Sequence, residues 1–545
     1  MDFILTLHSH LPYVLNHGRW PHGSDWLCEA ALDTYLPLVE QLRALQTERQ
    51  AAPVTIGITP VLANQLAHPT FVAEFDRFLE QRLAACAEAP ASLEKTRDLA
   101  LLPLVDYWRG RLLRLQALWR SLDGDLVRTF RRFQDEGSLE IIGSAATHGY
   151  LPLLARPESI ALQLRTGQAE HRRLFGRGAA GCWLPECAYR PGVEAHLADA
   201  GFRYFFTDAH LARAGAPLGA YPDVPLGVER FDVERGSGPE PAPIAAVRSP
   251  NRAYQVRAAA PTVATLVRDP ASSLQVWSRH QGYPGDAAYL EFHKIRWPGG
   301  LKLWRVTGPD VDLGAKTAYD PATAQERARE HARHFAHLIG GFAAKDGAPG
   351  AVVVAPFDTE LFGHWWFEGV DFIAALYREL RHQPQVRAVS AWRHLEDHPP
   401  ELGVRLAEGS WGVNGDHTMW RNDQTAWTWK RLGPLEHRFW SVAPKALASN
   451  DARPVLAQAA RELLLAQASD WQFMISTGAV PDYAEQRFNL HCADAEALVA
   501  ALEAGAAAGA LASARALQAR DDVFPDVLDA VTGALGSRAA TLAPA

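Results

Sequence analysis

The sequence predicts an α/β fold with a mainly parallel sheet, and three observations lead to this prediction. Over residues 1–400, short apolar runs alternate with longer segments of helical period, which is the pattern of repeated βα units. One long stretch without strand signals, at about residues 70–135, interrupts the alternation. After about residue 405, a segment rich in Trp and Gly leads into amphipathic helices.

Seven segments have the character of strands, and seven strands would close a small barrel. They are residues 3–10, 54–60, 139–150, 181–189, 202–210, 351–360 and 386–392. Helical segments follow three of them, at residues 157–175, 191–201 and 367–380. The pattern is compatible with a closed sheet or an open one.

The same pattern predicts the domain organisation. We expect a catalytic domain over residues 1–400, with a helical insertion at 70–135. Residues 401–530 are predicted to form a C-terminal helical domain, and residues 531–545 a disordered tail. The stretch 234–256 is rich in Pro, Gly and small residues and is predicted to be a long loop, as binding loops and lids often are.

Composition excludes several classes of function. The net charge is −8 and no dense block of Lys and Arg occurs, so we expect neither nucleic acid nor a membrane surface as partner. Five scattered cysteines form no disulfide framework or zinc ribbon, and neither a basic, apolar leader nor a membrane-spanning run is present. A cytoplasmic protein is expected. We find no P-loop and no G-x-S-x-G motif.

The 17 tryptophans point to a carbohydrate ligand. Several stand in loop-like, Gly-rich contexts, such as GSWGVNGDHTMW at residues 409–420. A single tryptophan is more often a core residue, but a flat indole in a groove suits the apolar face of a sugar ring. Clusters beside glycine and polar residues therefore favour an oligosaccharide.

Polar side chains stand where several predicted strands end. In TLHSHLPY, His8 and His10 share one face of the first strand by the period of two, and Pro12 stops the strand. His148, Glu186 and Asp358 follow later apolar runs, at the edge where barrels and open sheets place their chemistry.

Glu186 and Asp358 have a functional interpretation and a structural one. Two carboxylates across a cleft are what glycosidic chemistry needs, one as nucleophile and one as proton donor. Either residue alone could equally be a helix N-cap or an ion-pair partner, for example of Arg190. The two histidines at the first strand also fit a metal-dependent hydrolase, although the later strand ends add only His148 and the two carboxylates. We expect no metal and no other cofactor.

Several motifs together resemble a known family. TLHSHLPY, SLEIIGSAATHGY, CWLPECAY, FDTELFGHWWFEG and QASDWQF, in this order, resemble the five signature regions of glycoside hydrolase family 57, and within it those of the 1,4-α-glucan branching enzymes. HGRWPHGSDWLCEA, DPASSLQVWSRHQGYPGD and the segment from GSWG to MWRND extend the resemblance to about residue 495. It implies a (β/α)7 barrel with an inserted helical domain and a C-terminal α-helical domain.

The resemblance also implies a reaction and roles for residues. By position in its motif, Glu186 corresponds to the nucleophile and Asp358 to the acid/base of a retaining transglycosylase, which cleaves α-1,4-glucan and forms α-1,6 branches. The residues that the resemblance places in substrate binding are His8, His10, Trp26, His148, Trp277, Trp411, Trp420, Asp470 and Trp471. The family needs no metal, and the implied partner is an α-1,4-glucan chain.

One departure from the family bears on the outcome of the reaction. These branching enzymes carry a loop tyrosine that closes over the site, and the corresponding stretch here, about 233–262, is longer and Pro-rich, with Tyr254 as the candidate. A 4-α-glucanotransferase or an α-amylase using the same carboxylates is therefore the first alternative. A metal-dependent polysaccharide deacetylase and a non-catalytic glucan-binding protein are the others.

Overall fold

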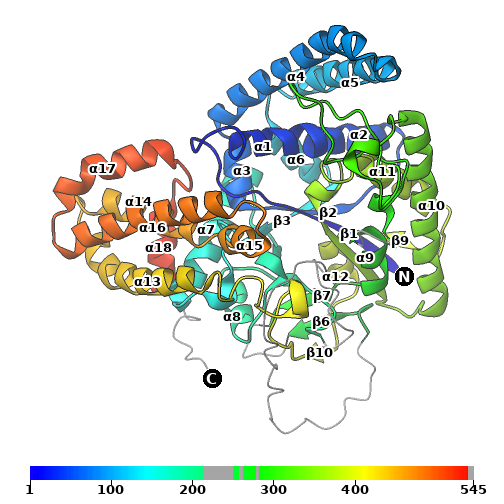
Figure 1. Ribbon diagram of the computed structural model, residues 1–545. Helices are drawn as coiled ribbons and strands as arrows, with labels where there is room; N and C mark the ends of the chain where they lie inside the picture. The colour runs from blue at the N-terminus through cyan, green and yellow to red at the C-terminus, as the bar shows by residue number, and fades with distance from the viewer. Residues whose placement is uncertain (213–248, 257–261, 278–281, 538–545) are drawn as a thin grey trace.

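The computed structural model describes residues 1–212, 249–256, 262–277 and 282–537. Within these residues, the centre of the fold is a curled sheet with seven parallel strands (Figure 1). They are β1 (Asp2–Ser9), β2 (Val54–Ile58), β3 (Leu139–Ser144), β4 (Gly181–Trp183), β5 (Tyr204–Thr207), β7 (Ala264–Val267) and β8 (Val352–Asp358).

The strands follow each other in the order β8-β1-β2-β3-β4-β5-β7. A parallel bridge between Arg268, just after β7, and Val354 in β8 brings the two ends of this row together. The amide of Asp269 also donates to the carbonyl of Val354 at 2.8 Å. The predicted α/β class and seven-stranded barrel architecture are thereby confirmed.

One predicted barrel strand was wrong. Residues 386–392 contribute only β9 (Arg387–Ala388), which pairs with the start of β1. The seventh strand is instead β7, paired antiparallel with β6 (Ala253–Val256), and β6 also pairs with β10 (Gly403–Val404). Four-residue strands carry too little periodicity to stand out, and their pairing with β5 and β10 is decided by tertiary contacts. Residues 253–256, predicted as loop, are therefore a strand, while 234–248 lies outside the described residues.

Helices surround the sheet (Figure 1). They are α1 (Ser24–Ala30), α2 (Leu36–Thr47), α3 (Pro60–Leu66), α7 (Pro157–Phe175), α8 (Val193–Asp199), α9 (Pro270–Trp277), α10 (Pro321–Lys345), α11 (Gly369–Leu380) and α12 (Ala391–Asp397). Local signals set their ends: the Asp320 carboxylate caps the start of α10, and α7 ends at Gly176 in the left-handed conformation.

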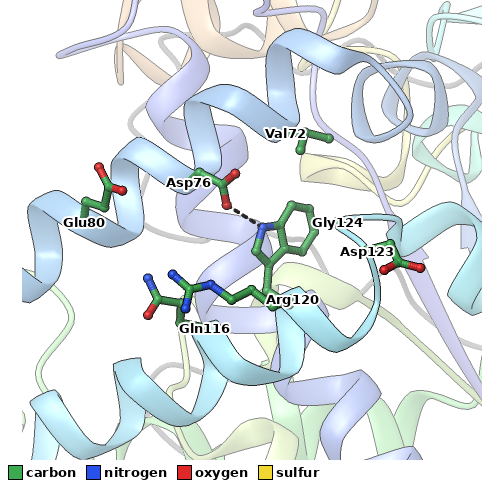
Figure 2. Close-up of a pocket in the computed structure, with 8 residues that line it drawn as sticks. Val72, Asp76, Glu80, Gln116, Arg120, Asp123 and Gly124 are labelled. Atoms are coloured by element: carbon green, nitrogen blue, oxygen red, sulfur yellow. Dashed lines mark hydrogen bonds between the residues drawn. The ribbon is translucent and has the colours of Figure 1, made fainter.

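Residues 69–135 are helical, as α4 (Pro69–Thr96), α5 (Leu102–Ser121) and α6 (Leu126–Asp135). In Figure 1, α4 and α5 project side by side from the barrel. Phe71 and Phe75 of α4 pack around Trp119 of α5, whose Nε1 donates to Asp76 at 2.8 Å. A pocket of about 350 Å³ lies at this contact. Figure 2 shows the residues that line it, most of them polar, from α4, α5 and the turn after α5.

The last part of the chain forms a helical layer beside the barrel (Figure 1). Its members are α13 (Ala426–Leu447), α14 (Arg453–Ala466), α15 (Asp470–Thr477), α16 (Pro481–Glu503), α17 (Ala507–Arg520) and α18 (Val527–Leu535). Helix α18 corrects the predicted tail, because residues 531–535 are helical and Val531 and Ala534 are buried. Residues 538–545 lie outside the described residues, and the division into domains stays a prediction.

Within the described residues, no helix combines the length and the apolar character needed to cross a bilayer.

Candidate active site

The end of β1 carries a stack of aromatic rings. His8 lies over Trp183 with the ring centroids 4.7 Å apart, and the rings of His8 and His10 are nearly parallel at 6.1 Å. His148, which follows β3, stacks on His10 at 4.0 Å, and its Nε2 lies 3.0 Å from Nε2 of His8. The period of two in TLHSH therefore places both histidines on one face, and His148 joins them there.

Of the three stacked histidines, His10 has the shortest contact with a carboxylate. Its Nε2 lies 2.9 Å from Oδ2 of Asp470 at the start of α15, and its Nδ1 lies 3.0 Å from the hydroxyl of Thr59. Burial lowers the pKa of His10, but the Asp470 carboxylate outweighs it, and the pKa is raised overall. Burial holds the pKa of His8 and His148 well below the usual range, so that these two imidazoles are neutral.

Glu186 follows β4 on the turn Pro185–Cys187 and carries three polar neighbours. Nε1 of Trp411 donates to its Oε2 at 2.9 Å, the hydroxyl of Ser469 donates to Oε1 at 3.3 Å, and Nδ1 of His148 lies 3.7 Å from Oε1. Burial raises the pKa of Glu186 to about 7, against the bond from Trp411, and the charge of Asp470 adds to the rise.

The backbone at this turn is strained. Glu186 has φ 61° and Cys187 has φ 47°, and His148 on the neighbouring strand end has φ 59°. A residue with a side chain pays of order 1 kcal/mol for the left-handed conformation, and such residues persist where the surroundings hold them in place. The turn aims the Glu186 carboxylate toward Trp411 and Ser469, which come from the region after residue 400.

Asp358 is the last residue of β8 and lies beside His8 in the β1–β8 register. Burial raises its pKa well above the usual range, and the negative charges of Glu360 and Glu186 raise it further. The carboxylates of Asp358 and Glu186 are thus within electrostatic reach of each other. The site therefore favours the protonated form of Asp358, while the pKa of Glu186 is about 7.

Glu360 is a third carboxylate of the site that the sequence analysis did not single out. The hydroxyl of Tyr35 and the amide of His10 both donate to its Oε1. Burial raises the pKa of Glu360 to about 7, against the bond from Tyr35. Its place two residues after Asp358, at the end of the same strand, was the signal that could have found it.

Tryptophans and one arginine border the carboxylates. Trp411 contacts Trp183 edge to face at 5.1 Å and Trp277 at 6.0 Å. The guanidinium of Arg268 lies over both Trp277 and Trp411, at 5.9 and 5.5 Å from the ring centroids, and pairs with Asp208 at 3.1 Å. Arg268 was missed because only the closure of the barrel brings it there.

Trp26, also expected to bind glucan, is half-buried. Its ring contacts Tyr483 of α16 edge to face at 5.4 Å and lies 5.4 Å from the ring of His22. It therefore stands where the first helix of the chain meets the C-terminal helices.

Two other tryptophans that were expected to bind substrate, Trp420 and Trp471, are buried, and their role in substrate binding stays a prediction. Trp420 is 1% exposed and stacks on Tyr150 at 4.5 Å. Trp471 is 0% exposed, and its Nε1 donates to the carbonyl of Leu465 at 2.9 Å. Neither indole presents an open face to a sugar, because tertiary packing from both sides covers them. They support the walls of the site.

Tyr254 is not on a loop over the site. It belongs to β6, is buried, and its hydroxyl donates to the carbonyl of Ser249 at 2.7 Å. The greater part of the stretch 233–262, in which the loop tyrosine was sought, lies outside the described residues.

Two clusters in the described residues have the composition of a metal site. His10, His148 and Asp470 offer ligand atoms within 4.8 Å of one another. All four ring nitrogens of these two histidines already lie within hydrogen-bond distance of protein groups, so a metal ion would have to displace those bonds.

The second cluster is Glu462, His491 and Asp521 in the C-terminal helices. Arg520 lies 2.5 Å from Asp521 and 3.6 Å from Glu462 and supplies positive charge there. It is therefore a buried ion-pair network as it stands.

A parallel barrel with two buried carboxylates of raised pKa at its strand ends, bordered by tryptophans, defines the class: an enzyme that acts on glycosidic bonds. The model of glycosyl hydrolase family 57 matches residues 4–406, and the chain belongs to this family. A second model, described as the C-terminal part of 1,4-alpha-glucan branching enzyme, matches residues 434–531.

Relatives and solved structures agree with this assignment. A 1,4-alpha-glucan branching enzyme of Thermococcus kodakarensis is 38% identical over 90% of this chain and 72% of its own. A probable 1,4-alpha-glucan branching enzyme of Mycobacterium tuberculosis is 32% identical over 92% of both chains. The crystal structure of the Thermococcus enzyme matches with a TM-score of 0.87 over 97% of this chain and 96% of that one, at 36% identity.

Proposed function

We propose that the protein is a 1,4-α-glucan branching enzyme, a retaining transglycosylase. The observation that carries the proposal is the pair Glu186 and Asp358, two carboxylates after β4 and at the end of β8, which lie close enough that the charge of Glu186 raises the pKa of Asp358. The family, the match to a branching-enzyme C-terminal part, and relatives named as branching enzymes support α-1,4-glucan as substrate.

In the first half of the reaction, Glu186 attacks the anomeric carbon while Asp358 donates its proton to the departing glycosidic oxygen. The raised pKa of Asp358 suits the proton donor, because the environment favours its protonated form. Glu186 must be ionised to attack, and the donated bonds from Trp411 and Ser469 together with the charge of His10 favour its carboxylate form.

In the second half, Asp358 is a carboxylate and removes the proton from the 6-hydroxyl of an acceptor glucose. The acceptor oxygen then attacks the anomeric carbon, the bond to Glu186 breaks, and an α-1,6 linkage forms. Water competes for the same intermediate. An oriented sugar hydroxyl has a large effective-concentration advantage over loosely held water, and Trp277, a half-buried indole that packs against Trp411, is the group that we expect to orient it.

The remaining residues of the site act on charge and position. Asp470 raises the pKa of His10, and in its imidazolium form His10 favours the carboxylate form of Glu186. His8 and His148, as neutral imidazoles, offer one donor and one acceptor each to sugar hydroxyls or to each other. No step of this mechanism uses a metal ion.

The test is incubation with amylose followed by proton NMR. Branching produces α-1,6 anomeric signals at the expense of α-1,4 signals, with few new reducing ends. New reducing ends without α-1,6 signals would instead establish the second candidate, an α-amylase. That candidate is favoured by one observation: the structure of the α-amylase AmyC from Thermotoga maritima matches over 97% of this chain with a TM-score of 0.81 at 28% identity.

The cellular setting is part of the proposal. Cys28, Cys86, Cys182, Cys187 and Cys492 are all free thiols in buried positions. Unpaired cysteines suit a reducing compartment, which supports a cytoplasmic location beside stored α-glucan.

A further inference from the structure

The turn after β8 displays an exposed tryptophan beside a buried one. Trp365 is 55% exposed, whereas Trp366 is 1% exposed and packs in the core. The turn is rigid: Gly363 has φ 106° and lies so close to the backbone of Asp33 that a Cβ there would be 2.1 Å from its carbonyl oxygen. The amide of Trp365 donates to the carbonyl of Glu360 at 3.2 Å, so that the exposed indole is tied to the turn of the active site.

Phe292 supports this indole from one side. The two rings are 4.6 Å apart with their planes 30° from parallel, and the ammonium of Lys302 lies 4.9 Å from the Phe292 centroid. Among the described residues, the recorded ring contacts of Trp365 are with Phe292 and, edge to face, with His364. Because Trp365 is 55% exposed, part of its indole surface is open to solvent. We call Phe292 and Trp365 the outer aromatic platform.

Polar groups border the platform. Asp33 lies 3.1 Å from the ammonium of Lys302 and 3.4 Å from Nδ1 of His364. Burial alone would raise the pKa of Asp33, but Lys302 and His364 outweigh it and hold the pKa well below its usual range, so the group is ionised. An exposed aromatic surface bordered by an ionised carboxylate, an ammonium and an imidazole suits a ligand with one apolar face and many hydroxyls. A purely apolar partner would leave these charges desolvated.

The same short segment of chain contacts both the platform and the catalytic centre. The π-helical turn Ala31–Tyr35 between α1 and α2 directs Asp33 to the platform and Tyr35 to Glu360. π-Helical turns occur frequently at functional sites. Asp33 and Tyr35 are two positions apart and contact different sites, which gives a reason for the irregular geometry of this turn.

We propose that the outer aromatic platform is a binding subsite for a part of the α-glucan chain away from the bond that is cleaved. The inference rests on the proposed function for its ligand. A long chain would contact both the catalytic centre and the platform, and a short one only a single site at a time. Once one part of a long chain is bound, its second contact forms at a high effective concentration, so the platform increases the affinity for long chains more than for short ones.

The experiment measures glucan binding without turnover, by calorimetry in the Glu186→Gln background. Trp365→Ala should weaken the binding of maltodecaose about tenfold, and Trp365→Phe by less, while maltotriose binding changes less than about twofold. Leu99→Ala is the control, because it removes another exposed apolar side chain, 57% exposed, from the helical insertion. It should alter neither affinity.

Unchanged maltodecaose binding in Trp365→Ala would refute the subsite, and so would an equal loss of affinity for maltodecaose and maltotriose. A change in the oligomeric state of Trp365→Ala in sedimentation would also refute it, because the platform would then be a contact between copies of the chain. The proposed function is judged separately by the α-1,6 signals of the wild type. If the wild type gives no α-1,6 signals but Trp365→Ala still weakens the binding of long chains more than of short ones, the subsite is supported and the branching function is refuted. If the α-1,6 signals are present but Trp365→Ala does not weaken maltodecaose binding, the branching function is supported and the subsite is refuted.

Discussion

Replacing Trp411 by phenylalanine tests how the nucleophile is kept ionised. The substitution retains most of the aromatic surface and removes the N–H that donates to Oε2 of Glu186 at 2.9 Å. The bond favours the charged form, so its loss must raise the pKa of Glu186 above the present value of about 7.

The size of the shift follows from the strength of the bond. A hydrogen bond to a charged group contributes about 1.5–3 kcal/mol, and one pKa unit corresponds to about 1.4 kcal/mol. Trp411→Phe should therefore raise the pKa of Glu186 by about one to two units. Because Glu186 attacks only as carboxylate, activity below the pKa falls about tenfold for each unit. At pH 6 the variant should be at least about tenfold slower than wild type, and at pH 9.5 it should recover most of this loss.

The assay is kcat/KM for amylose branching between pH 5 and pH 9.5. Trp277→Phe is the matched control, since Trp277 contacts the ring of Trp411 but its Nε1 is buried without a partner among the described residues. That variant should change KM and leave the acidic limb in place. If kcat/KM of Trp411→Phe falls by the same factor at every pH and the acidic side of its pH profile does not shift, the reasoning is refuted and Trp411 acts only through packing.

Three further outcomes are expected. Glu186→Gln should lower kcat by more than about 10³-fold with the fold intact by circular dichroism, because no other carboxylate can form the covalent bond; residual branching near wild-type rate would contradict its role. Glu360→Gln should raise the free energy of unfolding in urea by about 2–3 kcal/mol at pH 8 and leave it unchanged at pH 4. The reason is that the pKa of Glu360 rises from 4.5 to about 7 on folding, so the wild-type protein loses stability as the pH rises through this window and the glutamine variant does not. Equal stabilities of the two proteins at pH 8 would refute this. Exhaustive chelation should leave branching activity unchanged, and a loss restored by a divalent ion would revive the metal-dependent alternative.

Local patterns in the sequence determined much of this protein. The period of two in TLHSH put His8 and His10 on one face, and the apolar runs ending in Glu186 and Asp358 located both carboxylates at strand ends. Helix α7 was predicted at its observed bounds, because a Pro at its first position and a Gly after its last are local signals. These features depend on a few neighbouring residues, and such features can be read from a sequence.

Only the tertiary structure decided the rest. Whether β7 or residues 386–392 completed the sheet depended on pairing with β5, which no short window contains. The partners of Glu186, Trp411 and Ser469, come from more than 220 residues further along the chain, as their separations of 225 and 283 show. Their hydrogen bonds, and the burial that raises the pKa of Glu186, exist only once the C-terminal region is packed on the barrel.

The tryptophans show the same difference between what the sequence determines and what only the tertiary structure decides. The sequence marked a region rich in indoles but could not separate Trp411, which donates to a carboxylate, from Trp420, which is sealed in the core. It also could not show that Trp365 is exposed while Trp366 is buried, since both follow the same turn. Exposure is a property of what the rest of the chain covers, and this is why the sequence determined the chemistry at the strand ends and the tertiary structure decided which surfaces can meet a sugar.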